Sequence, residues 1–194
     1  MKMITDNEKR LANATELIRL FETEREPERL RESSIELENV DLRRVNDKKV
    51  REDQRGRCLA LWLTLVRSVD RNLDPSYDPD DSPPLKVDPP PLKDGTKLWP
   101  GADPKLIDDP KAREEYEKAI VANRERQEKV LFQSQLHELD QQLFDKAITF
   151  IRRNYAENER DSVKVTIEKT IESESRKQLF DVALESRPIK KPDE

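Results

Sequence analysis

Histidine, cysteine and glycine are so scarce in this sequence that several kinds of site are excluded at once. Cys58 is the only cysteine, which excludes a disulfide within the chain, and His137 is the only histidine. Together they cannot supply the ligands of a zinc site built on cysteine and histidine. The only glycines are Gly56, Gly95 and Gly101, and they form neither a G-x-G-x-x-G motif nor a phosphate-binding P-loop. Carboxylate-only metal sites stay open, with "DPSYDPDDS" as the densest acidic patch, but this patch lacks the glycine and the terminal glutamate of an EF-hand loop and favours a solvated turn. We therefore predict no cofactor and no metal.

Long apolar runs are also missing. The longest, from Leu59 to Val66, is interrupted by Thr64 and is far too short to span a bilayer. The first ten residues, "MKMITDNEKR", lack the apolar core of a signal peptide, although a signal segment removed earlier would leave no trace. These features predict a cytoplasmic protein without a membrane partner.

The chain as a whole has many charged residues and few apolar ones. Charged residues make up 41% of the chain and hydrophobic residues 34%, against about 25% and 45–50% in typical globular proteins. The 37 basic and 42 acidic residues are interleaved and give a net charge of −5, which argues against a general polyanion binder. The composition predicts a fold with a thin core, built either from long helices with narrow apolar stripes or as an oligomer that shares its core.

The N-terminal part, residues 5–73, has helical periodicity. We expect a first helix over 6–25, with Thr5 and Glu8 in a capping box, and a break or a new helix at Pro27. Residues 28–45 are ambiguous but favour helix. Residues 46–73 indicate a central helix, apolar on nearly every side over 59–66 and therefore surrounded by protein.

A basic stripe precedes the apolar part of this central helix. Arg44, Lys48, Arg51 and Arg55 lie within about 60° of one another at 100° per residue. Such a stripe can follow nucleic-acid phosphates, bind another protein, or pair with the chain's own acidic residues. We expect glutamates of "FETEREPE", residues 21–28, to be the internal partners.

The C-terminal part, residues 110–186, also indicates helices. Asp109 and Pro110 form a good helix start before residues 111–139. Further helices are expected over 144–156, 161–171 and 174–185, the last two capped by Asp161 and Ser173, followed by a frayed tail over 187–194.

Between these parts, residues 74–109 are rich in proline, and residues 74–110 hold ten of the chain's thirteen prolines. Apolar residues spaced through the segment, including Tyr77 and Trp99, argue against a plain flexible linker. We expect an ordered strap that lies over the helices and lets the next long helix run roughly parallel to the central one. In such a strap Trp99 alone could bury on the order of 200 Å². A flexible linker and a ligand for an SH3- or WW-type groove remain the alternatives.

A resemblance also appears here. The proline-rich stretch followed by Asp-Pro-x-x-Arg-x-x-Tyr-Glu-x-Ala-Ile-x-x-Asn, within residues 77–143, resembles a loosely defined set of uncharacterised bacterial helical proteins. The resemblance implies a bacterial origin and favours an ordered strap over a eukaryotic ligand motif. It implies no activity and no catalytic residue.

The sequence as a whole predicts an all-α fold: one domain over 1–194, a bundle of long amphipathic helices with an ordered, extended proline-rich crossover. The predicted function is non-enzymatic, a protein–protein interaction module of adaptor, regulatory or immunity type, whose partner is another protein or a second copy. A nucleic-acid-associated factor and a carboxylate-based hydrolase are the alternatives. The candidate interaction surface comprises Arg44, Lys48, Arg51, Arg55, Tyr77 and Trp99.

Overall fold

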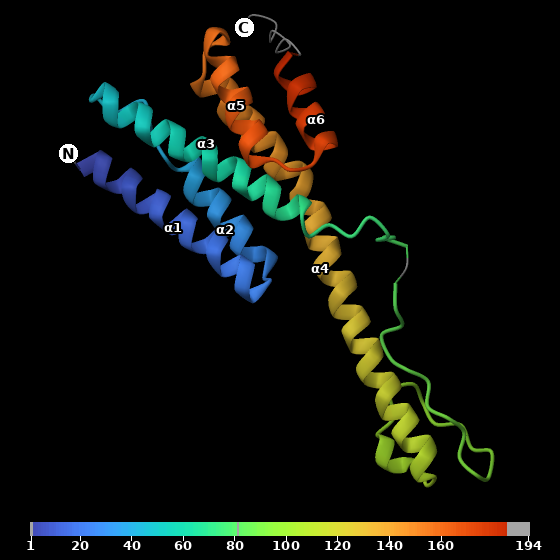
Figure 1. The fold of residues 1–194 in the computed structure, drawn as a ribbon. Coiled ribbons are helices and arrows are strands. Elements are labelled where there is room, and N and C mark those ends of the chain that lie inside the picture. Colours follow the sequence, from blue (N-terminus) through green and yellow to red (C-terminus); the bar gives the residue numbers. More distant parts are fainter. Residues whose placement is uncertain (1, 81, 186–194) are drawn as a thin grey trace, which may run out of the picture. The chain divides into compact units, whose positions relative to one another are not determined.

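The computed structural model describes residues 2–80 and 82–185, and the described chain is helical without β-strands (Figure 1). The prediction of an all-α bundle with an ordered proline-rich crossover is confirmed. The predicted frayed tail, 187–194, lies outside the described residues. The helices are α1 (Lys2–Glu24), α2 (Pro27–Glu38), α3 (Lys48–Asp70), α4 (Pro110–Asn154), α5 (Arg160–Thr170) and α6 (Glu174–Glu185), with short 3₁₀ turns η1 (Pro104–Leu106) and η2 (Glu157–Glu159).

The chain divides into two compact units. The first is drawn from residues 1–73 and 136–194, and the second from residues 74–135. The long helix α4 contributes its second part to the first unit and its first part to the second. The single domain over 1–194 stays a prediction.

In the first unit, α1 and α2 pack against each other and against α3. Thr5 lies inside α1, which already begins at Lys2, so the predicted capping box at Thr5 is wrong. The helix extends upstream because Met3 and Ile4 are partly buried and prolong its apolar stripe. Pro27 begins α2 at the first helical position, where its missing N–H leaves no bond unmade.

Residues 39–47 form a loop, so the helix favoured over 28–45 ends earlier than expected. Asp47 caps α3 by accepting a hydrogen bond from the Val50 N–H at 3.0 Å. Leu42 and Val45 are buried and anchor the loop to the core. The basic stripe therefore begins in a loop, at Arg44, and continues onto α3.

The second half of α3 is the centre of this unit's core, as predicted. Trp62 is 2% exposed, and the apolar α3 residues buried with it are Cys58, Leu59, Leu63, Leu65, Val66 and Val69. Helix α5 packs on α3 and on α6, and the second part of α4 adds buried residues at Leu136, Leu139, Leu143, Ala147 and Ile151. No helix in the described chain has the length and hydropathy needed to cross a membrane.

A buried arginine ties three helices of this unit together. Arg176 on α6 has a side chain only 10% exposed, and it donates to both carboxylate oxygens of Asp140 on α4, at 2.7 and 2.9 Å. Asp70 at the end of α3 lies 3.4 Å from the same guanidinium, and the Phe144 ring lies beneath it. Paired in this way, the charge can stay in a largely apolar environment.

Helix α4 is one continuous helix of 45 residues, whereas the sequence favoured separate helices over 111–139 and 144–156. No glycine or proline lies between Leu139 and Phe144, and Asp140 is stabilised in the helix interior by Arg176. The predicted start is confirmed, since the Asp109 carboxylate accepts from the N–H groups of Lys111 and Ala112.

Of the two caps predicted for the last two helices, the one at Asp161 is wrong and the one at Ser173 is confirmed. Helix α5 begins at Arg160, directly after η2, so that Asp161 lies within its first turn and does not cap it. Ser173 precedes α6, and its hydroxyl accepts from the Arg176 N–H at 3.4 Å, as a cap does.

In the second unit, residues 87–101 form a hairpin-shaped loop, here called the proline hairpin. At its tip the Gly95 N–H donates to the Leu92 carbonyl and the Leu92 N–H donates to the Thr96 carbonyl, with Gly95 in the left-handed region at φ 81°. At its base the Gly101 N–H donates to the Val87 carbonyl at 2.9 Å. A regular ladder cannot form between base and tip, because three consecutive prolines, Pro89, Pro90 and Pro91, lack N–H donors.

The proline-rich segment lies along the first part of α4 (Figure 1). The Tyr116 hydroxyl donates to the Val87 carbonyl at 3.1 Å, and the amides of Asn123 and Gln127 both donate to the Pro84 carbonyl. The predicted order of the segment is thus confirmed, and within the second unit the segment packs on the first part of α4. The expected burial of Trp99 is wrong, since its side chain is 61% exposed.

Candidate functional site

The predicted basic stripe is not a uniform free surface. Arg44 lies 3.4 Å from the Asp41 carboxylate, and Lys48 lies 3.8 Å from Glu52 one turn further along α3. Arg51 is exposed and makes no ion pair with any described residue. Acidic residues of the chain itself therefore lie beside part of the stripe, in exposed pairs that contribute little to stability.

Arg55 at the end of the stripe is largely buried in a structural cluster. Its guanidinium donates to both carboxylate oxygens of Glu159, at 2.8 and 3.2 Å, and to the Asn154 carbonyl at 2.9 Å. It also lies over the Tyr155 ring, 4.4 Å from the centroid. A cation that binds the last carbonyls of a helix stabilises that end, so Arg55 holds the C-terminus of α4.

The stripe's acidic partners are not the ones expected from the sequence. We predicted glutamates of residues 21–28, but the acidic partners are Asp41, Glu52 and Glu159. Glu159 follows Arg55 by 104 residues, so sequence proximity could not indicate it. The hydrogen bonds from Arg55 lower the pKa of Glu159, which keeps this carboxylate ionised.

The two aromatic candidates lie in the second unit. Tyr77 is half-buried, in a turn where its N–H donates to the Asp74 carbonyl at 3.0 Å. Trp99 projects from the returning arm of the proline hairpin. Leu85, two residues before the hairpin, is 92% exposed. Leu85 and Trp99 thus lie on two chain segments that are joined by the hydrogen bond from the Gly101 N–H to the Val87 carbonyl. The side chains of Leu85 and Trp99 are here called the hairpin surface.

The backbone beneath the hairpin surface is firmly held. Pro84, next to Leu85, is fixed through its carbonyl by two α4 amides, and the Asp103 carboxylate accepts from the Lys105 N–H to cap η1. The Arg113 guanidinium donates twice to the Ile107 carbonyl, at 2.7 and 3.0 Å. Large apolar side chains are thereby presented to solvent on an ordered support.

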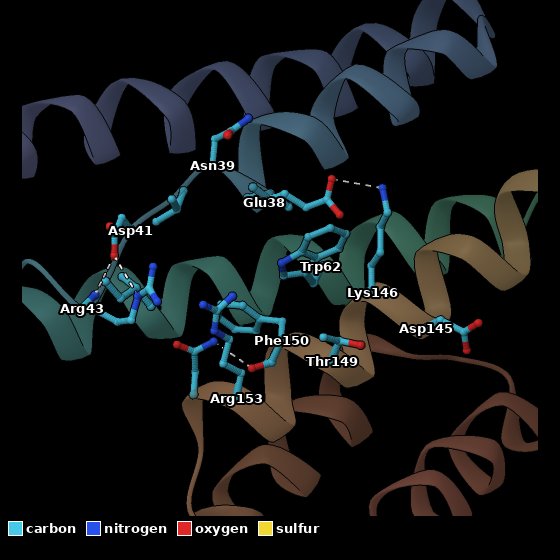
Figure 2. Close-up of a pocket in the computed structure, with 14 residues that line it drawn as sticks. Glu38, Asn39, Asp41, Arg43, Trp62, Asp145, Lys146, Thr149, Phe150 and Arg153 are labelled. Atoms are coloured by element: carbon cyan, nitrogen blue, oxygen red, sulfur yellow. Dashed lines mark hydrogen bonds and ion pairs between the residues drawn. The ribbon is translucent and has the colours of Figure 1, made fainter. Parts of the chain in front are cut away.

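Sequence reasoning did not identify a pocket in the first unit (Figure 2). It encloses about 520 Å³ between the end of α2 with its following loop, residues 37–43, and residues 145–154 of α4. Trp62 of α3 also lines it. The volume is in the range of small-molecule sites, about 300–1,000 Å³. No spacing in the sequence indicates this pocket, because its walls come from three separate elements.

Asn7 of α1 fixes the loop wall of the pocket. Its side chain is 1% exposed and forms two hydrogen bonds with the backbone of Asp41, donating to the carbonyl at 3.1 Å and accepting from the N–H at 3.2 Å. The same amide donates to the Gln54 side chain at 2.9 Å. The loop is therefore positioned by two hydrogen bonds from a buried side chain.

Each carboxylate in the pocket already has a donor. Glu38 pairs with Lys146 at 3.2 Å, and Asp145 accepts from the Gln141 amide at 2.8 Å. Burial opposes ionisation of Asp41, but hydrogen bonds and charge from Arg43, together with the charge of Arg44, outweigh it and lower the pKa of this carboxyl. A general acid needs a raised pKa, so Asp41 is not suited to that role.

The two residues of the types that most often carry chemistry are a buried cysteine and an exposed histidine. Cys58 is fully buried, and burial raises the pKa of its thiol to about 12, as expected of a core residue. His137 is exposed on α4. Within the described ranges, no three His, Cys, Asp or Glu side chains come together as metal ligands.

No protein-family model, curated protein or solved structure matches this chain. The resemblance noted in the sequence therefore stays a prediction.

Proposed function

We propose that this chain is a non-enzymatic protein-interaction module that binds another protein, or a second copy of itself, through the hairpin surface. The observation that carries the proposal is the exposure of Leu85 and Trp99, at 92% and 61%, on a backbone fixed to α4. Tryptophan is among the residues that contribute most to protein interfaces.

The ordered support favours binding, because little conformational freedom is left to lose when a partner docks. Prolines restrict the backbone of the segment, and the hydrogen bonds from Tyr116, Asn123 and Gln127 fix two of its carbonyls. A partner with an apolar groove would bury both exposed side chains and gain the free energy of removing them from water.

The alternatives receive less support. Three cations of the basic stripe face acidic residues of the chain, and phosphate binding would have to compete with those pairs. The pocket's carboxylates are hydrogen-bonded or paired with basic residues, so a carboxylate-based hydrolase lacks an evident acid–base pair.

Site-specific photo-cross-linking tests the proposal. A benzophenone side chain placed at position 99 or 85 of the full chain should give defined adducts in the native cells, whereas the same group at Lys118, exposed on α4, should not. Sedimentation of the purified chain over a wide concentration range decides whether a second copy is the partner.

A supporting result has two parts: a defined adduct at the hairpin surface, and binding of the purified partner weakened at least about tenfold by Trp99→Ala. Absence of both self-association and any adduct above the level at position 118 would overturn the proposal.

A further inference from the structure

We infer that the pocket of the first unit binds a small organic oxyanion, with an aromatic or aliphatic body, through the indole N–H of Trp62 and the guanidinium of Arg153. The site is made of residues 37–43, Trp62 and residues 145–154, none of which belongs to the hairpin surface. The inference goes beyond the proposed function and does not depend on it.

The first support is an unpartnered donor. Trp62 is 2% exposed, and its Nε1 is buried without a hydrogen-bond acceptor. An indole nitrogen can only donate, so the group that satisfies it must be an acceptor. An unpaired buried donor is unfavourable, and an acceptor on a bound ligand would supply the hydrogen bond that it lacks.

The second support is the charge balance of the lining. The acidic side chains of Glu38, Asp41 and Asp145 all have donors of their own. Arg153, in contrast, is exposed and makes no ion pair with any described residue. Because the two groups without partners are a cation and a neutral donor, the complementary ligand is an anion.

The third support is the arrangement of these groups. Figure 2 shows Arg43 from the loop and Arg153 from α4 extending into the pocket from different walls, with Trp62 and Phe150 beside them. Leu42 and Val40 add apolar surface to the lining. Such a mixture suits a ligand with one charged end and one apolar end.

Fluorescence and NMR titrations test the inference on the full chain carrying Trp99→Phe, in which Trp62 is the only tryptophan. Benzoate and phenyl phosphate are the anionic probes, and benzyl alcohol and benzylamine are the neutral and cationic controls. We expect a saturable change in Trp62 emission and a downfield shift of its indole N–H resonance with an anionic probe only. The two anions separate a carboxylate site from a phosphate site.

Two variants complete the test. Arg153→Gln should weaken binding of the preferred anion at least about tenfold, while Arg124→Gln, which removes an exposed arginine from the second unit, should leave it unchanged. Equal binding of benzyl alcohol and the anions, or an unchanged affinity in Arg153→Gln, would overturn the inference. So would the absence of any saturable response to both anions.

Discussion

The buried arginine of α6 provides the sharpest test of how the first unit is held together. Replacing Arg176 by methionine keeps much of its apolar volume but leaves Asp140 and Asp70 without the cation between them. Removing one partner of a buried ion pair costs about 3–5 kcal/mol. Since the side chains of Asp140 and Asp70 are 21% and 23% exposed, solvent should screen part of the loss, and we expect about 3 kcal/mol.

The assay is chemical denaturation followed by far-UV circular dichroism, with thermal melting as a second measurement. A loss of about 3 kcal/mol corresponds to a decrease in Tm of roughly 6–12 °C for a chain of this size. A cycle with Asp140→Asn should give a coupling energy of about 1–3 kcal/mol, because the two side chains share two hydrogen bonds.

The control is Arg19→Met, which removes an exposed ion pair with Glu16 on α1 and should leave Tm unchanged. The reasoning would be refuted if Arg176→Met cost less than about 1 kcal/mol, or no more than the control.

Four further outcomes are expected. Arg55→Met should lower the free energy of unfolding by about 1–2 kcal/mol through the lost bond to the Asn154 carbonyl, whereas Arg51→Met should change it by less than about 0.5 kcal/mol; equal effects would contradict this. Because the folded-state pKa of Glu159 is below its ordinary 4.5, stabilisation by its pair with Arg55 is present above pH 4.5 and lost on further acidification. The difference in unfolding free energy between wild type and Arg55→Met, measured by urea melts, should therefore shrink on acidification to the part due to the Asn154 carbonyl bond, and an unchanged difference would contradict this. Gly101→Ala should speed amide exchange over residues 85–103 more than Gly95→Ala does, since both glycines have positive φ but only an added Cβ at 101 would meet Lys86, at 2.8 Å. Cys58 should resist thiol reagents in the folded chain and react at once in denaturant; rapid native labelling would disprove its burial.

Much of the helical architecture could be predicted because it depends on local signals. Apolar periodicity located α3 and its buried half, and the Asp109–Pro110 pair located the start of α4. The division of α4 into two helices was wrong because the sequence near Asp140 looks polar. Within the helix the Asp140 carboxylate is stabilised by hydrogen bonds from Arg176, which lies 36 residues further along the chain and so gives no local signal.

The candidate surfaces could be predicted less well, for a related physical reason. A helical projection placed four cations on one face, but it could not show that α3 begins only at Lys48 or that Glu159 would pair with Arg55. The order of the proline-rich segment was predictable from its apolar residues, whereas its packing on α4 depends on side chains such as Tyr116 and Asn123. The Trp62 N–H lies unpartnered where the loop after α2, helix α3 and helix α4 come together, and no single stretch of sequence indicates this arrangement.

The run of Pro89, Pro90 and Pro91 affects how other chains can bind to this protein. An exposed hairpin normally offers an edge to which a foreign strand can add, with backbone donors ready for intermolecular sheet growth. Here three successive positions of one arm have no such donor, so strand addition along that arm is blocked. A protein that binds this arm therefore contacts its side chains and carbonyl groups. The missing donors also protect the segment from amyloid-like stacking, while the Trp99 indole stays accessible.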